Sequence, residues 1–135
     1  GFLSRRTARD IAFKVLFQVD LVKAEPWESM QHMLDERRLS GKDQDFCWYL
    51  VQGTLHNLPE IDLCISRYSK DWPIERMAAV DRNILRLAAY EIMFSEDVHP
   101  IVAIDEAVEL AKKYGDENSK SFVNAILDRI RDEKR

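Results

Sequence analysis

Glycine and proline are scarce in this sequence, and their scarcity excludes several classes of protein. The chain of 135 residues has 4 glycines and 4 prolines, whereas 46% of its residues are hydrophobic and 33% are charged. Disordered chains and β-rich domains usually carry more turn-forming residues or fewer apolar ones. The composition therefore predicts one compact, helix-rich domain that is long enough to bury a core.

Long apolar runs are absent as well. No run approaches the roughly 18 apolar residues that a membrane span requires. The apolar part of the first helical segment is interrupted by Lys14, Gln18 and Asp20, so we expect no signal peptide. The two cysteines, Cys47 and Cys64, have no metal-ligand spacing. We interpret them as buried, reduced thiols of a cytoplasmic protein that has no contact with a membrane.

Catalytic and metal-binding patterns are also missing. The three histidines, His32, His56 and His99, are far apart, and the four glycines are too isolated to form a phosphate-binding loop. Asp105 and Glu109 share one helix face, a layout that a metal or acid–base site could use. No matching carboxylate–histidine pair is found elsewhere, and a solvated acidic segment explains both residues. We therefore expect no enzymatic activity, no metal and no cofactor.

The most informative stretch that is present covers residues 80–94, VDRNILRLAAYEIMF. Its apolar residues recur at helical spacing, but they occupy most of the circumference rather than one narrow face. A helix of this kind must be surrounded by other helices. We expect it to be the central rod of a helical bundle.

Apolar positions at helical spacing continue along the rest of the chain, and we expect about seven helices with no strand. The ends of the segments carry typical signals: Ser4 as the first N-cap, Pro59 as an interruption, and Gly115 as a C-cap. We expect the chain to fray from Asp132. The predicted fold is an all-α helical double bundle, with residues of about 4–70 in the N-terminal bundle and 71–135 in the C-terminal bundle. The predicted helices span about residues 4–22, 26–34, 43–58, 61–68, 80–94, 101–114 and 119–131, with a single turn at 74–77 and a charged loop at 35–42.

The net charge of −4 conceals an uneven distribution. Residues 1–23 carry a net +3 and residues 119–135 a net +2, which leaves −9 for the middle of the chain. Basic terminal segments on either side of an acidic middle segment favour an anionic partner that binds locally, rather than non-specific binding of polyanions. Arg5, Arg6 and Arg9 lie at a helix N-terminus, where positive charge opposes the helix dipole. This cost is tolerable at the surface, but it is a reason to look for a compensating ligand there.

Four blocks of the sequence resemble the NusB family, and together they span nearly the whole chain. They are RRTAR at residues 5–9, DRNILRLAAYE at 81–91, AIDEAVELAKKYG at 103–115 and FVNAILD at 122–128. Residues 25–42 carry no resemblance. The resemblance implies two three-helix bundles and a role in transcription antitermination. In that role a NusB-like protein pairs with NusE, a ribosomal protein, and the heterodimer binds the boxA element of nascent RNA. It then joins the RNA polymerase antitermination complex and supports ribosomal RNA synthesis. Some family members form a homodimer when free of NusE.

The resemblance and the residue chemistry point to RNA contacts at two places. Arginines of the N-terminal cluster can bind phosphates and stack on unpaired bases, and Lys14 would extend this row of basic side chains along the helix. Each of these side chains is also explained as an ordinary solvated one. The loop before the last predicted helix leaves free N–H groups that can donate hydrogen bonds to a phosphate or a base edge. Asn118 stands where many family members carry an acid, and an amide repels phosphate less. Phe122 is either a core residue or a stacking residue. The predicted RNA-binding residues are Arg5, Arg6, Arg9, Lys14, Asn118, Ser119, Lys120 and Phe122.

For the NusE side, the resemblance implies contacts from the first helix and from the start of the central helix. The predicted residues are Phe17, Leu21, Glu75 and Asp81. An acidic patch with an exposed aromatic suits a basic ribosomal protein. Asp81 at a helix N-terminus is also favourable without any partner.

Two other functions remain open at this point. The same fold resembles the N-terminal domain of certain RNA cytosine methyltransferases, and a glycine-rich methyl-donor loop in a longer parent chain would favour that alternative. The second is a helical adaptor that binds only proteins. It predicts that the N-terminal arginines are dispensable and that binding depends little on salt.

Overall fold

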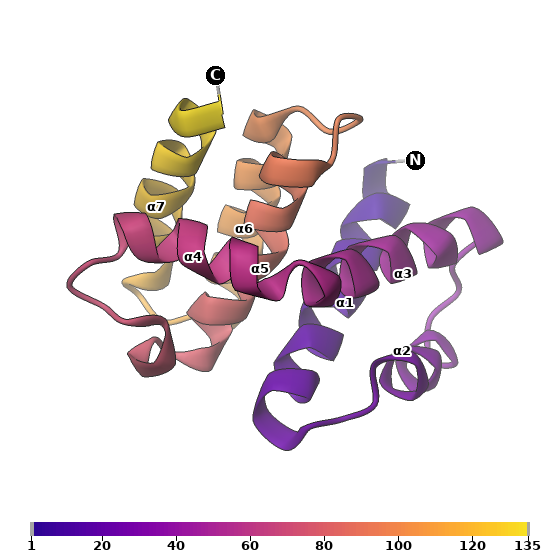
Figure 1. Ribbon diagram of the computed structural model, residues 1–135. Coiled ribbons are helices and arrows are strands. Elements are labelled where there is room, and N and C mark those ends of the chain that lie inside the picture. Colours follow the sequence, from indigo (N-terminus) through magenta and orange to yellow (C-terminus); the bar gives the residue numbers. More distant parts are fainter. Residues whose placement is uncertain (1, 135) are drawn as a thin grey trace. The chain divides into compact units, whose positions relative to one another are not determined.

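The computed structural model describes residues 2–134, with side chains from Ser4 onward, so Gly1 and Arg135 of the predicted 1–135 domain lie outside the described residues. This part of the chain is helical and contains no strand, which confirms the all-α prediction (Figure 1). None of the described helices is long and apolar enough to cross a membrane. The elements are α1 (Phe2–Val22), α2 (Pro26–Leu34), α3 (Gly41–His56), α4 (Leu58–Tyr68), the 3-10 turn η1 (Ile74–Arg76), α5 (Ala79–Phe94), α6 (Pro100–Tyr114) and α7 (Ser119–Lys134).

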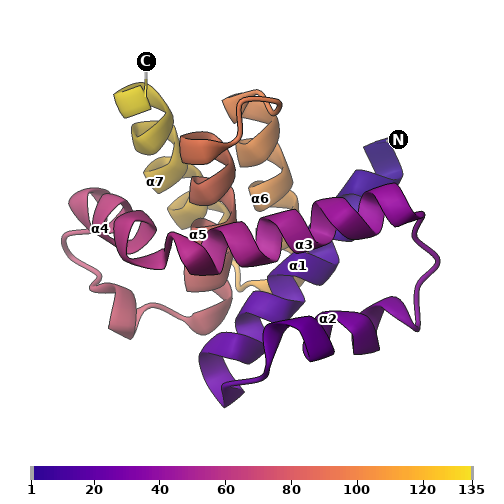
Figure 2. The same cartoon turned by 45° about the vertical axis from the view of Figure 1, so that its right-hand side comes forward.

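The first compact unit covers residues 1–56 and consists of α1, α2 and α3. α1 packs against both other helices, and α2 packs against α3 (Figure 2). The apolar face that the sequence indicates on α1 is buried, with Ile11, Ala12 and Val15 at most 1% exposed. α2 begins where expected because Pro26 occupies its first turn and the Glu25 carboxylate accepts a hydrogen bond from the Glu28 backbone N–H.

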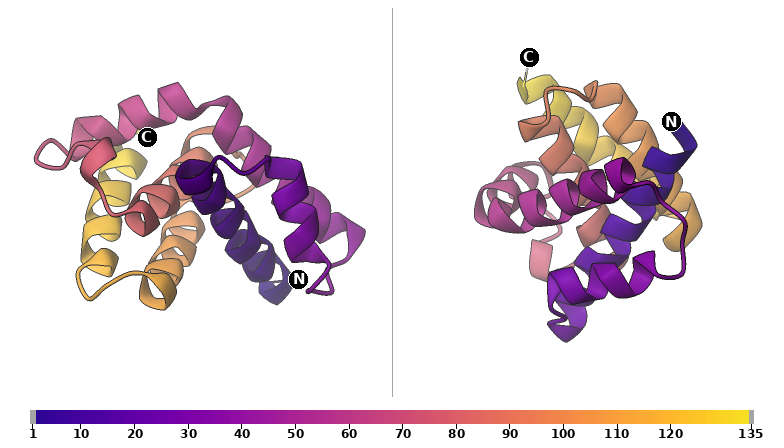
Figure 3. Two further views of the ribbon diagram at one scale, coloured as in Figure 1. Left: turned by 90° about the horizontal axis from the view of Figure 1, so that it is seen from below. Right: turned by 90° about the vertical axis from the view of Figure 1, so that its right-hand side faces the viewer.

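The second unit covers residues 57–135. α5, α6 and α7 pack against one another pairwise, and α4 packs against α5 and α7 (Figures 1 and 3). α5 is buried over most of its circumference, including Ile84, Leu85 and Ile92, none of which is measurably exposed. The prediction of a central helix is therefore confirmed for this unit.

The boundary between the units differs from the predicted one. The sequence indicated bundles of about residues 4–70 and 71–135, but the division lies between His56 and Asn57, so α4 belongs to the second unit. The guanidinium of Arg86 on α5 forms two hydrogen bonds with the Asp62 carboxylate on α4, at 2.9 and 2.8 Å. This paired contact and the packing on α7 join α4 to the second unit.

Two predictions about helix ends are wrong. α1 begins at Phe2, and the Ser4 hydroxyl hydrogen bonds to Asp43 instead of capping the helix. At the other end, α7 continues to Lys134 rather than fraying from Asp132. The Glu133 carboxylate accepts hydrogen bonds from Arg67, at 2.7 Å, and from the Tyr68 hydroxyl, so the last turn is held against α4. The contacts of Glu133 join residues that are distant in sequence, and local sequence signals do not report them.

Candidate functional site

The N-terminal arginines lie on α1 beside one aromatic ring of α3. The Cζ atom of Arg5 is 4.0 Å from the centre of the Phe46 ring, and that of Arg9 is 5.2 Å away. A guanidinium over an aromatic face is a favourable cation–π arrangement. Arg5 and Arg6 are partly exposed, but Arg9 is only 5% exposed. Arg5 and Arg6 therefore offer charge at the surface, whereas Arg9 packs inside the unit.

Acidic side chains of the same unit offset part of this positive charge. Lys14, on the next turns of α1, forms an ion pair of 3.3 Å with Asp10. The pKa of Asp43 is held below its ordinary value, first by the hydrogen bond from Ser40 and also by Ser4 and the charge of Arg5. The basic cluster is thus embedded among carboxylates, which limits how strongly this unit alone attracts a polyanion.

The loop between α6 and α7 is closed by a compact set of hydrogen bonds. The Asp116 carboxylate accepts from the Asn118 backbone N–H at 2.8 Å and from the Ser119 hydroxyl at 3.3 Å. The Ser119 hydroxyl in turn accepts from the Asp116 backbone N–H at 3.0 Å. Ser119 is only 2% exposed, and its hydroxyl is occupied by hydrogen bonds within the loop. Asn118 and Lys120 are exposed. Of the predicted RNA-binding residues in this loop, these last two are the accessible ones.

Gly115 ends α6 as predicted, but for a different reason from the one that the sequence indicated. Its φ of −89° and ψ of −176° are extended, not left-handed. A Cβ at this position would lie 2.3 Å from the Ser119 hydroxyl oxygen and 2.8 Å from the Ala111 carbonyl oxygen. Glycine is required because α7 begins directly against the end of α6.

Asp81 connects this loop with the start of α5. The residue is 9% exposed, and its Oδ1 atom is buried without a hydrogen-bond partner. Burial raises the pKa of the Asp81 carboxyl; the charge of Asp116 acts in the same direction, and the nearby Ser119 hydroxyl opposes both. The structure therefore brings a residue predicted for NusE contact together with the loop predicted for RNA.

A pocket of about 300 Å³ opens at this place. It is lined by Asp81, Asn118 and Phe122, which the sequence indicated, and by Trp72 and Arg76, for which the sequence suggested no role. Phe122 is partly buried and faces this pocket, and Trp72 is 56% exposed. The one local signal that could have found Trp72 is a large aromatic next to Pro73 in a segment that interrupts the helical pattern. The complete lining is Trp72, Arg76, Met77, Ala78, Asp81, Asp116, Asn118 and Phe122.

The remaining residues predicted for NusE contact are divided between the two units. Phe17 on α1 is partly buried, with its ring 6.1 Å from that of Phe13, and Leu21 is 50% exposed. Glu75 is exposed on η1 in the second unit. Leu21 and Glu75 are accessible to a protein partner, whereas Asp81 is nearly enclosed.

A sequence model of the NusB family matches residues 6–132. The chain belongs to the NusB family. It is 55% identical over 132 residues to the transcription antitermination protein NusB of Syntrophomonas wolfei, an alignment that covers 98% of each chain.

Solved structures of the family share the fold of this NusB-family chain. T. maritima NusB superimposes with a TM-score of 0.90 at 44% identity, covering 96% of this chain and 91% of that one. A NusB chain from a complex of the antitermination factors NusB and NusE with double-stranded RNA superimposes with a TM-score of 0.89 at 31% identity, covering 98% and 99%. The similarity extends over both units, so neither is an addition peculiar to this chain.

Proposed function

We propose that this chain is a transcription antitermination factor that binds RNA together with NusE. The observation that carries the proposal is family membership over residues 6–132, supported by the likeness to a NusB chain in a complex with NusE and RNA. In this proposal the RNA is a boxA element of a nascent transcript, and the protein–RNA complex joins RNA polymerase in the cytoplasm to support ribosomal RNA synthesis. The chain acts as a regulatory factor and not as an enzyme.

The distribution of charge supports an RNA site that this chain shares with NusE rather than one that it forms alone. The chain carries a net −4, so its long-range field repels a polyanion. Arg5 and Arg6 on α1, and Lys120 at the start of α7, offer local positive charge at partly or fully exposed positions. A basic partner that covers part of the acidic surface lowers this repulsion, which is the contribution we assign to NusE.

The residues that we propose for the NusE side are Phe17, Leu21, Glu75 and Asp81, of which Leu21 and Glu75 are accessible contacts and the enclosed Asp81 is a support. In the first unit Leu21 supplies exposed apolar surface, and in the second unit Glu75 supplies an exposed negative charge that suits a basic protein. The same surfaces are available for self-association when NusE is absent, so we propose a homodimer as the form of the free protein.

The test is RNA binding by fluorescence anisotropy with labelled boxA-type RNA, with and without NusE, over a series of salt concentrations. The variant is Arg5→Ala/Arg6→Ala, which spares the buried Arg9. We expect NusE to tighten binding, and the variant to lower affinity and reduce the salt slope by about one to two, because each lost phosphate contact removes about 0.7 from the slope for a single strand.

The matched control is Arg37→Ala/Arg38→Ala, which removes the same charge from exposed positions of the same unit. It should leave the salt slope unchanged. If no RNA binds in any mixture while NusE still associates, the chain is a protein-binding adaptor and the proposal is wrong.

A further inference from the structure

Part of the wall of the pocket beside the α6–α7 loop is formed by residues that belong neither to the basic cluster on α1 nor to the loop. Trp72 and Arg76 come from the segment between α4 and α5, and they line the pocket together with Asn118 and Phe122. Figure 1 shows that this segment and the α6–α7 loop lie at the same, lower end of the second unit. An exposed tryptophan and a partly buried phenylalanine thus face one space of about 300 Å³.

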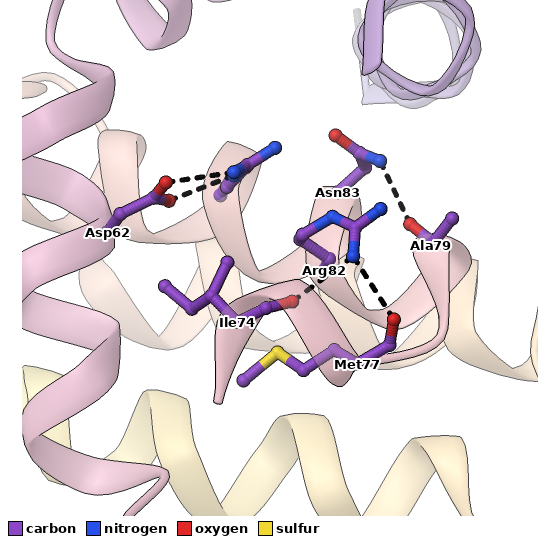
Figure 4. A network of polar contacts seen from close by, with 7 residues as sticks. Asp62, Ile74, Met77, Ala79, Arg82 and Asn83 are labelled. Carbon is purple, nitrogen blue, oxygen red and sulfur yellow. Dashed lines mark hydrogen bonds and ion pairs between the residues drawn. The ribbon is translucent and has the colours of Figure 1, made fainter. Parts of the chain in front are cut away.

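Hydrogen bonds to its backbone hold the segment between α4 and α5 in position. The Trp72 backbone N–H donates to the Ser69 carbonyl at 2.9 Å. The Arg82 guanidinium on α5 donates to the carbonyls of Ile74 and Met77, at 3.1 Å each, and so joins η1 to the central helix (Figure 4). A binding surface that is already ordered loses less conformational entropy when a ligand enters.

The lining selects among possible occupants. Asp81 and Asp116 place carboxylates at the pocket and disfavour a phosphate inside it. Arg76 disfavours a lysine or arginine of a protein partner, and the Oδ1 atom of Asp81 is buried too deeply to serve as an exposed counter-ion. A neutral, flat group with a polar edge suits both the aromatic side chains and the exposed Asn118 amide. An unpaired nucleobase has this chemistry.

We propose that this pocket binds one unpaired base of the RNA, with Trp72 as the stacking residue and Arg76 beside the phosphate of the same nucleotide. The inference rests on the proposed RNA-binding function and adds residues and a structural preference to it. Stacking needs a free base face, so the pocket favours single-stranded over double-stranded RNA. Trp72 contributes through its ring and not through charge.

The test compares Trp72→Ala and Trp72→Phe in the full chain with NusE present, using boxA-type RNA as a single strand and as a duplex. We expect Trp72→Ala to bind the single strand about 5- to 150-fold more weakly, the range that loss of one base–aromatic stack produces. Trp72→Phe should retain most of the affinity. The salt slope should stay unchanged, since no cation is lost, and duplex binding should be unaffected.

The matched control is Trp27→Ala in the first unit, because Trp27 is 47% exposed and lies outside the pocket. It should bind the single strand like the wild type. Circular dichroism and NusE affinity check that each variant is folded; with Trp72 more than half exposed, its loss should not unfold the chain.

Three results would overturn the inference. If Trp72→Ala binds the single strand like the wild type while Arg5→Ala/Arg6→Ala is impaired, RNA binding stands and the base pocket does not. If Trp72→Ala weakens NusE binding and leaves RNA affinity at fixed NusE saturation unchanged, the occupant is a protein side chain. If the wild type binds no RNA even with NusE, the proposed function is wrong, and the base pocket, which depends on it, is wrong as well.

Discussion

At the scale of single residues, the structure shows residues whose role depends on one close neighbour. Gly115 illustrates this, because its backbone is in an ordinary extended conformation and glycine is required only by the approach of Ser119. Arg9 and Asp81 are further cases: each is charged, each was predicted to contact a partner, and each is less than a tenth exposed. Their burial makes them supports of the proposed sites more than accessible contacts.

Gly115→Ala should destabilise the protein by about 1–3 kcal/mol, because the new methyl group would force Ser119 or the end of α6 to move. Urea unfolding followed by circular dichroism measures the change. Gly41→Ala is the control, since nothing lies within 4 Å of a Cβ there, and it should be neutral or stabilise by up to about 1 kcal/mol. Equal effects of the two substitutions would contradict the role assigned to the close approach.

At the scale of elements, α4 shows how contacts between helices decide membership of a unit. Its sequence continues the apolar pattern of α3 past Pro59, which favoured a place in the N-terminal bundle. Its side chains instead pack on α5 and α7, and Asp62 receives the paired hydrogen bonds of Arg86. The side chains of Arg86 and Asp62 are only 12% and 26% exposed, so water screens this ion pair less than a surface pair.

A double-mutant cycle with Arg86→Met and Asp62→Asn should give a coupling energy of about 1–2 kcal/mol in the free energy of unfolding. The comparison is the pair Lys112–Glu109, at 3.3 Å with side chains 55% and 43% exposed, whose cycle should give less than about 0.5 kcal/mol. A coupling for Arg86–Asp62 no larger than that of the surface pair would show that this contact does not hold α4 to α5.

At the scale of the whole molecule, each unit contains one buried cysteine. Cys47 in the first unit has no measurable exposure, and burial raises the pKa of its thiol to about 12. Cys64 in the second unit is 4% exposed, and burial, followed by the charge of Glu133, raises its thiol pKa as well. Because the thiolate is the reactive form, both cysteines should react only when their unit opens.

Labelling of both thiols with a disulfide reagent at mildly alkaline pH should be about a thousandfold or more slower in the native protein than in concentrated guanidinium chloride. Mass spectrometry of the peptides assigns the rate to each unit. Ser66→Cys places a thiol at an exposed position of α4 and should react rapidly in the native protein. Rapid native labelling of Cys47 would show that the first unit is not closed around it.

The sequence by itself determined the helices, the buried central segment at residues 80–94, the basic cluster on α1 and the family, because periodicity, caps and motifs are encoded by residues close together in the chain. Only the tertiary structure decided that α4 belongs with α5 and α7, that Glu133 prolongs the last helix, and that Arg9 and Asp81 are enclosed. It alone brought Trp72 and Arg76 to the same pocket as Asn118 and Phe122. These outcomes depend on contacts between residues distant in sequence, and the burial and electrostatics that follow from such contacts do not exist until the helices have packed.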